Sequence, residues 1–286
     1  MKSGIRILIV GHGFVGKAVE YGFTVPGNEI TVLDPLYEWK PDPGRPGVEY
    51  VYFMDVLKDR TFDLVFICVP TPMGENKIDS HIFREVMASL TLHVKTTLLV
   101  VKSTVTPDIA KEWPAIYNPE FLTERSSKFD FVHPKHNVIG CTNPVEAQDL
   151  IDMYEKYSLV DNIREKTHIC SVESACMIKY MLNCFGSMKI TFFNQLYDVC
   201  QENDISFVEV MKGITMSDRV GKEHTKVPGF DGKRGYGGAC FPKDIHAITS
   251  LYEGFTLLEE CIKINNDYRR DYRTSEREKE QNIKFE

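Results

Sequence analysis

The sequence predicts an α/β protein, in which a Rossmann-like, doubly wound parallel sheet domain is followed by a long central helix and a smaller all-helical domain. Short β-branched and apolar runs alternate with helix-compatible stretches up to about residue 170, which is typical of parallel strands with crossover helices. From Ser171 the pattern is helical for about thirty residues without a proline. We therefore expect a sheet domain over residues 1–170, the central helix and helical domain over 171–265, and a charged tail over 266–286.

Composition excludes several classes of function. The 286 residues are 43% hydrophobic and 26% charged, with a net charge of −7, which is ordinary for a soluble globular chain of about two domains. An acidic chain without a long basic run is a poor candidate for nucleic-acid binding, and no apolar run is long enough for a membrane span. The eight cysteines lack metal-ligand spacing, and His133 and His136 alone do not make a metal site. We expect a cytoplasmic protein that binds no metal, membrane or nucleic acid.

The first predicted strand runs directly into a glycine motif. Residues 5–10 form a β-branched run, and Gly-His-Gly-Phe-Val-Gly follows it before a helix-compatible stretch. In such a dinucleotide-binding turn the first glycine allows a tight turn, the second lets a pyrophosphate approach the backbone, and the third brings helix against strand. The phosphates would bind at the start of the helix. The expected cofactor contacts here are Gly11, Gly13, Phe14, Val15 and Gly16.

An acidic residue indicates which form of the cofactor binds. A second predicted strand ends in Asp34, about twenty residues after the glycines. Its carboxylate would accept hydrogen bonds from the ribose hydroxyls and repel a 2′-phosphate, which predicts NAD rather than NADP. As an alternative, Asp34 is a cap or turn acid before Pro35.

Candidate ligand contacts follow two further predicted strands, at residues 63–69 and 97–102. The carboxyl ends of parallel strands line the ligand crevice of an open sheet. Pro70, Thr71, Ser103 and Thr104 are therefore placed to contact cofactor or substrate. Later strands are expected over 137–140 and 167–170, with a helix over 144–157.

The predicted central helix carries a polar stripe. Lys179 and Asn183 lie four residues apart on one face, and Asn194 returns to nearly the same angle. On a helix rich in Met, Phe, Tyr and Cys this indicates a functional face, with a solvated stripe as the alternative. A shorter helix near 206–213 follows. The irregular run 218–234 has five basic and three acidic residues, which suits either an anionic substrate or a solvated loop. Beyond residue 266 we expect a closing helix and a frayed tail.

A cysteine directly after a glycine-rich turn is the strongest candidate for chemistry. In Gly-Tyr-Gly-Gly-Ala-Cys240, the cysteine is followed by Pro242, which suits the first turn of a helix. At the positive end of a helix a thiol pKa falls and the thiolate becomes a nucleophile. Asp244 follows one turn later, on the side of the sulfur. A buried structural cysteine is the alternative interpretation.

Taken together, these residues resemble the nucleotide-sugar (UDP-glucose/GDP-mannose) 6-dehydrogenase family. The resemblance runs in order from residue 5 to about residue 265. Its motifs are Gly11-His-Gly-Phe-Val-Gly, Cys68-Val-Pro-Thr-Pro, Lys102-Ser-Thr-Val-Thr-Pro, Asn118-Pro-Glu-Phe-Leu-Thr-Glu124, the helix with Glu173, Lys179 and Asn183, Asp218-Arg-Val-Gly221, and Gly237-Gly-Ala-Cys-Phe-Pro-Lys-Asp244.

The resemblance implies a four-electron, NAD-dependent oxidation of a primary alcohol of a nucleotide sugar to a carboxylate, foremost UDP-glucose to UDP-glucuronate. It implies that Cys240 forms a thiohemiacetal and then a thioester. The other implied catalytic residues are Thr104, Lys179 and Asp244 around a water, Lys179 and Asn183 at the oxyanion, and Glu120 as the base for hydrolysis. The implied binding residues are Glu124 for cofactor and substrate loop, Phe121, Leu122, Lys179, Asn183 and Gly237 for substrate, and Arg219 in the neighbouring site of a homodimer.

One departure from the family concerns the nucleotide. The family normally continues into a third domain that contacts the nucleotide half of the substrate, and this sequence stops at residue 286. GDP-mannose and a UDP-N-acetylhexosamine therefore stay open as substrates. Two other functions also stay open: a relative that binds a nucleotide or a partner without turnover, and a two-electron hydroxyacid dehydrogenase, which needs a helix lysine but no nucleophilic cysteine.

Overall fold

The computed structural model describes residues 4–38, 47–75 and 77–286, and the chain divides into two compact units. Unit 1 comprises Met1–Thr71 and Ser80–Lys179, and unit 2 comprises Pro72–Asp79 and Tyr180–Glu286. The division falls inside one long helix. The segment Pro72–Asp79 leaves the sheet unit and belongs to unit 2, which the sequence analysis did not anticipate.

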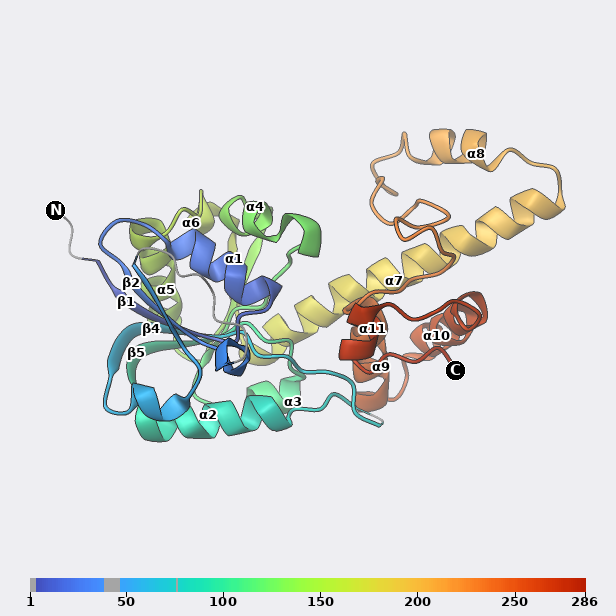
Figure 1. The fold of residues 1–286 in the computed structure, drawn as a ribbon. Coiled ribbons are helices and arrows are strands. Elements are labelled where there is room, and N and C mark those ends of the chain that lie inside the picture. The colour runs from blue at the N-terminus through green and yellow to red at the C-terminus, as the bar shows by residue number, and fades with distance from the viewer. Residues whose placement is uncertain (1–3, 39–46, 76) are drawn as a thin grey trace. The chain divides into compact units, whose positions relative to one another are not determined.

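Unit 1 is built on one eight-stranded sheet with the order β3-β2-β1-β4-β5-β6-β7-β8. Figure 1 labels four of its strands, β1, β2, β4 and β5. Every neighbouring pair is parallel except β6 and β7, which are antiparallel. The chain turns from β3 on one side of β1 to β4 on the other, so the strand order reverses there, as in dinucleotide-binding folds. The strands are β1 Arg6–Val10, β2 Glu29–Leu33, β3 Val48–Val51, β4 Thr61–Ile67, β5 Lys95–Val101, β6 Ile116–Tyr117, β7 Asn137–Gly140 and β8 Thr167–Cys170.

The central strands are apolar almost throughout because helices cover both faces of a parallel sheet. In β1, Ile7, Leu8 and Ile9 are fully buried. The predicted α/β class and the strands near 5–10, 30–34, 63–69, 97–102, 137–140 and 167–170 are confirmed. β3 and β6 were not predicted, because four and two residues are too short to show a period.

The helices of unit 1 follow the predicted alternation. α1 Phe14–Phe23 packs closely on α4 Ser127–Val132, since a Cβ on Gly22 would lie 2.2 Å from the Phe131 ring. α5 begins with Pro144 after an Asn143 cap whose side chain accepts the N–H of Val145, and the predicted helix over 144–157 is confirmed. Besides α1 and α4, the helical segments of unit 1 are α2 His81–His93, α3 Pro107–Ala110, α5 Pro144–Tyr157, α6 Ile163–Lys166 and the 3₁₀ turns Pro35–Glu38, Met54–Leu57 and Glu124–Ser126.

The long helix α7, Val172–Glu202, is the 31-residue central helix that the sequence predicts (Figure 1). Ser171 caps its start, because the Ser171 hydroxyl oxygen accepts the N–H of Ser174 at 3.1 Å. Unit 2 continues with α8 Phe207–Ile214, α9 Phe241–Leu251, α10 Thr256–Arg269 and α11 Glu276–Glu280. Among the described residues, no helix is both long enough and apolar enough to cross a bilayer.

The end of the chain is ordered, which corrects the expectation of a frayed tail. Ser275 and Glu278 form a complete capping box at the start of α11, and the Glu278 and Ile283 side chains are buried. Asn282 also donates to the carbonyl of Met73 at 2.9 Å. The charged, apolar-poor composition hid this helix, although the pattern Ser-x-x-Glu at 275–278 was a visible signal for it.

Candidate active site

The glycine motif adopts the geometry that a dinucleotide turn requires. Gly11 has φ +89°, and a Cβ there would lie 2.7 Å from the Cys68 carbonyl oxygen, so only glycine fits. A Cβ on Gly16 would lie 2.1 Å from the Gly11 oxygen, which is the close helix–strand approach. At Gly13, by contrast, a Cβ would meet nothing within 4 Å. This open space beside the start of α1 suits a pyrophosphate.

Asp34 completes the cofactor side of unit 1. It lies at the end of β2, where its Oδ2 accepts the His12 N–H at 2.7 Å and its Oδ1 accepts the Leu36 N–H at 2.9 Å. Each carboxylate oxygen accepts more than one hydrogen bond, so both retain capacity for ribose hydroxyls. The residues present therefore fit a dinucleotide with an unphosphorylated 2′-hydroxyl.

A buried polar cluster lies under this turn and was not anticipated. His12 Nε2 is 2.6 Å from Glu20 Oε2, and the Tyr50 hydroxyl donates to the same oxygen at 3.1 Å. The other ring nitrogen of His12 contacts the Tyr37 hydroxyl. A carboxylate buried as deeply as Glu20 needs such partners. The signal in the sequence for this cluster was His12 between the first two glycines, with Glu20 eight residues later.

The hydroxyls of Thr71 and Ser103, which follow β4 and β5, donate hydrogen bonds to backbone carbonyls of the protein. Thr71 donates to the carbonyl of Thr104 at 2.7 Å, and Ser103 donates to the carbonyl of Val69 at 2.7 Å. These bonds join the loops after β4 and β5. Both hydroxyl oxygens keep acceptor capacity, whereas Pro70 is exposed and Thr104 half-buried.

Lys179 and Glu120 form a buried ion pair within unit 1. Lys179 Nζ donates to the Glu120 carbonyl oxygen at 2.7 Å and lies 3.2 Å from Glu120 Oε1. Glu120 Oε2 accepts the Leu122 N–H at 2.7 Å, which fixes the carboxylate. The ammonium also lies 5.5 Å from the centre of the Phe121 ring. Lys179 is only 4% exposed, so the alternative of a solvated stripe is wrong at this position.

A second buried lysine supports the segment that carries Glu120. Lys102 Nζ donates to the carbonyl oxygen of Asn118 at 3.0 Å and lies 3.1 Å from its side-chain oxygen. The Tyr154 hydroxyl donates to that same side-chain oxygen at 2.9 Å. Burial lowers the pKa of Lys102 to about 8, and Lys179 adds to the decrease, while Cys68 and Glu120 oppose it. Lys102 begins the motif Lys-Ser-Thr-Val-Thr-Pro, but the sequence did not predict a role for its side chain.

In unit 2, Cys240 lies at the start of helix α9 as predicted. It is the N-cap residue, half-buried, with Pro242 in the first turn. Asp244 follows one turn later and is 1% exposed. Its carboxylate accepts hydrogen bonds from Lys243 Nζ at 2.6 Å and from the Asn183 side-chain amide at 2.5 Å. Lys243 was missed, although it immediately precedes Asp244.

Two of the five basic residues in the run before Cys240 bind other groups of unit 2. Arg234 donates to Asn194 and Asp198 and lies between the rings of Tyr197 and Tyr268. Lys233 Nζ donates to the carbonyl of Arg273 at 2.6 Å. These two cations therefore bind groups of unit 2, which differs from both interpretations of the run, an anionic-substrate loop and a solvated loop. The predicted Asn194 also binds the Gly235 N–H, whereas Arg219 and Glu124 are exposed.

Unit 1 thus gathers the glycine turn, Asp34 and the Glu120–Lys179 pair, and unit 2 gathers Cys240, Asp244 and Asn183. Lys179 and Asn183 share one continuous helix, one turn apart. Within residues 4–38, 47–75 and 77–286 no three potential metal ligands are grouped.

The fold and the glycine turn define a dinucleotide-binding α/β protein, and residues 52–158 match the NAD-binding domain of the UDP-glucose/GDP-mannose dehydrogenase family. Residues 173–267 match the central domain of the same family. The chain belongs to this family, which confirms the predicted resemblance.

Individual proteins are similar to this chain in sequence or in fold. The UDP-glucose 6-dehydrogenase of Rickettsia prowazekii is 28% identical over 298 residues, which cover 91% of this chain and 67% of that protein. A UDP-glucose dehydrogenase structure from Pyrobaculum islandicum has a TM-score of 0.78 at 22% identity and is covered to 68%, with 92% of this chain matched. A UDP-D-ManNAc dehydrogenase structure from Pyrococcus horikoshii has the same TM-score at 18% identity, with the same coverage of both chains. The chain spans about two thirds of the length of these relatives.

Proposed function

We propose that this protein oxidises the C6 primary alcohol of a nucleotide sugar to a carboxylate, with UDP-glucose to UDP-glucuronate as the first candidate. The observation that carries the proposal is the position of Cys240, a half-buried thiol at the start of α9 with a buried, hydrogen-bonded Asp244 one turn later. NAD, held by the glycine turn and Asp34, would accept one hydride in each of two successive oxidations. The net conversion consumes one alcohol, two NAD⁺ and one water, and yields one carboxylate, two NADH and three protons.

In the first oxidation the protein must remove the hydroxyl proton of the alcohol. Thr104, Lys179 and Asp244 are the proposed surroundings of a water that carries this proton away. The Lys179 ammonium, kept close to Glu120, would also stabilise the alkoxide that precedes loss of the hydride.

The second oxidation needs a covalent bond to Cys240. The thiolate attacks the aldehyde carbon, and the carbonyl oxygen becomes an alkoxide. Lys179 and Asn183 are the proposed donors to this oxyanion, which would account for two donors one turn apart on α7. Loss of a hydride from the same carbon leaves a thioester on the sulfur.

Hydrolysis of the thioester regenerates the thiol. Glu120 is the proposed general base for the attacking water, because its carboxylate is oriented by the Leu122 N–H and lies beside a cation. Water adds to the acyl carbon, the C–S bond breaks, and the proton removed from water is available to the departing sulfur.

We propose that residues of this chain and of a second copy of the chain bind the substrate together. Phe121, Leu122 and Gly237 are proposed to contact the substrate. Glu124 is proposed to help arrange the cofactor and the substrate loop. Exposed Arg219 is proposed to reach the neighbouring site of a homodimer. A surface for this dimer is the exposed apolar stripe of α7, which consists of Leu182, Phe185, Phe192 and Val199. We further propose that the protein acts in the cytoplasm.

The decisive measurement is the amount of NADH formed per sugar consumed, across a panel of UDP-, GDP- and ADP-hexoses that includes UDP-N-acetylhexosamines. Two NADH per sugar are expected, with UDP-glucose the best substrate. Cys240→Ser should lower acid production by about a thousandfold or more and stall the reaction after the first oxidation. Cys170→Ser, which alters another half-buried cysteine, is the matched control and should retain both oxidations.

Three results would contradict the proposal. One NADH per sugar with free aldehyde removes the thioester step and favours a two-electron dehydrogenase. Unchanged acid production by Cys240→Ser removes the cysteine from the mechanism. Binding of a nucleotide sugar without any NADH indicates a binding protein that does not turn over.

A further inference from the structure

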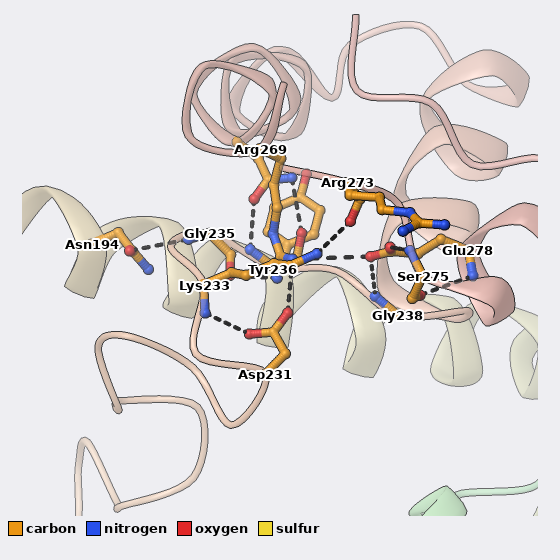
Figure 2. Close-up of polar contacts among 11 residues, drawn as sticks. Asn194, Asp231, Lys233, Gly235, Tyr236, Gly238, Arg269, Arg273, Ser275 and Glu278 are labelled. Carbon is orange, nitrogen blue, oxygen red and sulfur yellow. Dashed lines mark hydrogen bonds and ion pairs between the residues drawn. The ribbon is translucent and has the colours of Figure 1, made fainter. Parts of the chain in front are cut away.

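The backbone of the turn before Cys240 is held by side chains from other helices of unit 2 (Figure 2). From α7, Asn194 accepts the Gly235 N–H at 3.1 Å. From α10, the Asn265 side chain accepts the Tyr236 N–H at 2.6 Å and donates to the Tyr236 carbonyl at 3.1 Å. A side-chain amide that pairs with both groups of one residue imitates a strand partner and prevents rotation of that residue. The turn is therefore fixed from outside its own segment.

Two buried charges complete this arrangement. Arg269, the last residue of α10, donates to the Gly235 carbonyl at 3.1 Å and to Asp231 at 2.8 Å. Glu278 of α11 accepts the Gly238 N–H at 3.0 Å, and its carboxylate lies 4.0 Å from the Arg269 guanidinium. Each of the two side chains is only 2% exposed. Burying a charge is costly unless it is paired and hydrogen-bonded. Other conformations of the turn would break these hydrogen bonds, so the buried pair favours this one conformation.

Steric contact restricts the turn further. A Cβ on Gly237 would lie 2.5 Å from the Glu278 carboxylate and 2.7 Å from the Arg269 guanidinium carbon. Gly238 has φ +82°, a conformation that favours glycine. Cys240 follows Gly238 by two residues and starts α9. Any rotation of the Gly238 peptide therefore changes where α9 begins and where the sulfur lies.

We propose that Glu278, together with Arg269, is a positioning residue for Cys240, so that the C-terminal segment 275–286 is part of the framework of the reactive site. Glu278 would act on Cys240 through the Gly238 N–H, which its carboxylate accepts at 3.0 Å. The inference rests on the proposed function only in taking Cys240 as the reactive thiol. Its test uses the chemistry of that thiol directly and needs no sugar turnover.

The experiment measures the rate at which iodoacetamide alkylates each cysteine of the full-length protein, resolved by peptide mass spectrometry. Glu278→Ala removes the acceptor of the Gly238 N–H and should slow alkylation of Cys240 by about tenfold, since displacement by about 1 Å has large effects on reactivity. Cys170 in unit 1 is the internal reference and should not change. Glu276→Ala removes an equal charge from an exposed position of the same helix and should leave the Cys240 rate unaltered.

Two conservative variants separate positioning from folding. Glu278→Gln keeps one oxygen, which can accept the Gly238 N–H, while its NH₂ group faces the Ser275 N–H and weakens the start of α11. It should keep the Cys240 rate within about twofold of the unaltered protein, even where stability falls. Glu278→Asp keeps the charge but shortens the reach and should slow Cys240 as Glu278→Ala does, which decides the matter if the alanine variant does not fold. A purely structural role would instead loosen unit 2 and speed alkylation of the buried Cys184 and Cys261.

The inference is overturned if Cys240 reacts at its original rate in the alanine and aspartate variants, or if all cysteines of unit 2 react faster together. These results are independent of the proposed reaction. If Cys240→Ser still makes acid, the proposed function fails while the alkylation result stands. If the unaltered protein makes two NADH per sugar and Cys240 reactivity does not depend on Glu278, only the positioning role fails.

Discussion

Asp34 has a structural role in the described fold and is also the proposed contact of the cofactor ribose. Its Oδ2 accepts the backbone N–H of His12 in the glycine turn after β1, and its Oδ1 accepts that of Leu36, two residues along its own segment. The carboxylate therefore holds β1 and β2 together at their carboxyl ends. The same oxygens retain acceptor capacity, so a ribose diol can bind without displacing either protein hydrogen bond.

Replacing Asp34 by Asn should weaken NAD binding and reduce the preference over NADP. An amide has one oxygen, so its NH₂ group would face one of the two backbone N–H donors, and the negative charge that repels a 2′-phosphate is lost. We expect the Kd for NADH to rise by roughly 10- to 100-fold, because a hydrogen bond to a charged group contributes about 1.5–3 kcal/mol. The measurement is titration with NADH and NADPH by fluorescence or calorimetry.

Asp63→Asn is the matched control for this substitution. Asp63 also accepts a backbone N–H, that of Arg6 at 2.7 Å, but it lies near the amino end of β4 and away from the carboxyl ends of the strands. Its replacement should leave the ratio of NADH to NADPH affinity unchanged. An unaltered ratio in Asp34→Asn would leave Asp34 as a turn acid only.

At the scale of elements, the ends of β5 and β6 are joined by buried polar groups instead of apolar contacts. Lys102 follows β5 and Asn118 follows β6, and both are buried. The Asn118 amide donates in turn to the Asn137 side chain at 2.8 Å and to the Val138 carbonyl at 2.7 Å on β7. This network links three neighbouring strands and supports the backbone that leads to Glu120.

The lowered pKa of Lys102 predicts a specific dependence of stability on pH. The folded-state pKa, about 8, lies below the unfolded value of 10.5, so the unfolded chain binds more protons between these values. The free energy of unfolding that this group contributes therefore rises as pH increases through that window. Relative to Lys102→Met, the unaltered protein should gain about 2 kcal/mol between about pH 7 and about pH 9.5.

Urea unfolding of both proteins at the two pH values measures this difference. Comparing the pair cancels the titration of the cysteines and tyrosines that both chains share. The lowered pKa of Lys102 would be contradicted if the free energies of unfolding of the two proteins changed in parallel with pH. A loss of stability by the unaltered protein relative to Lys102→Met as pH rises would contradict it as well.

At the scale of the whole molecule, the proposed homodimer depends on the exposed stripe of α7. Phe185 and Phe192 are 59% and 58% exposed and lie seven residues apart, on one side of the helix. Phe192→Glu would place a charge in the proposed interface and should convert the dimer to a monomer, measured by sedimentation or light scattering. Gln201→Glu adds the same charge at an exposed position on another side of α7 and should remain dimeric. A monomeric unaltered protein would refute the dimer.

Features that depend on neighbouring residues could be predicted from the sequence. The glycine turn after β1, the long helix from Ser171 and the helix start at Cys240 follow from glycine sterics, from the absence of proline and from residue periodicity, which act within one or two turns of chain. Two short strands, the helix α11 and the internal use of Arg234 escaped prediction, because short or charged segments show no apolar period.

Only the tertiary structure decided which polar groups pair. Glu120 and Lys179 are separated by 59 residues, Asn183 and Asp244 by 61, and Gly238 and Glu278 by 40. The sequence predicted roles for Lys179, Asn183 and Asp244, but it could not predict the particular partner that each one binds. The physical reason is that a buried polar group must find a hydrogen-bond partner wherever apolar packing brings one, and that packing is set by the whole fold and not by local pattern.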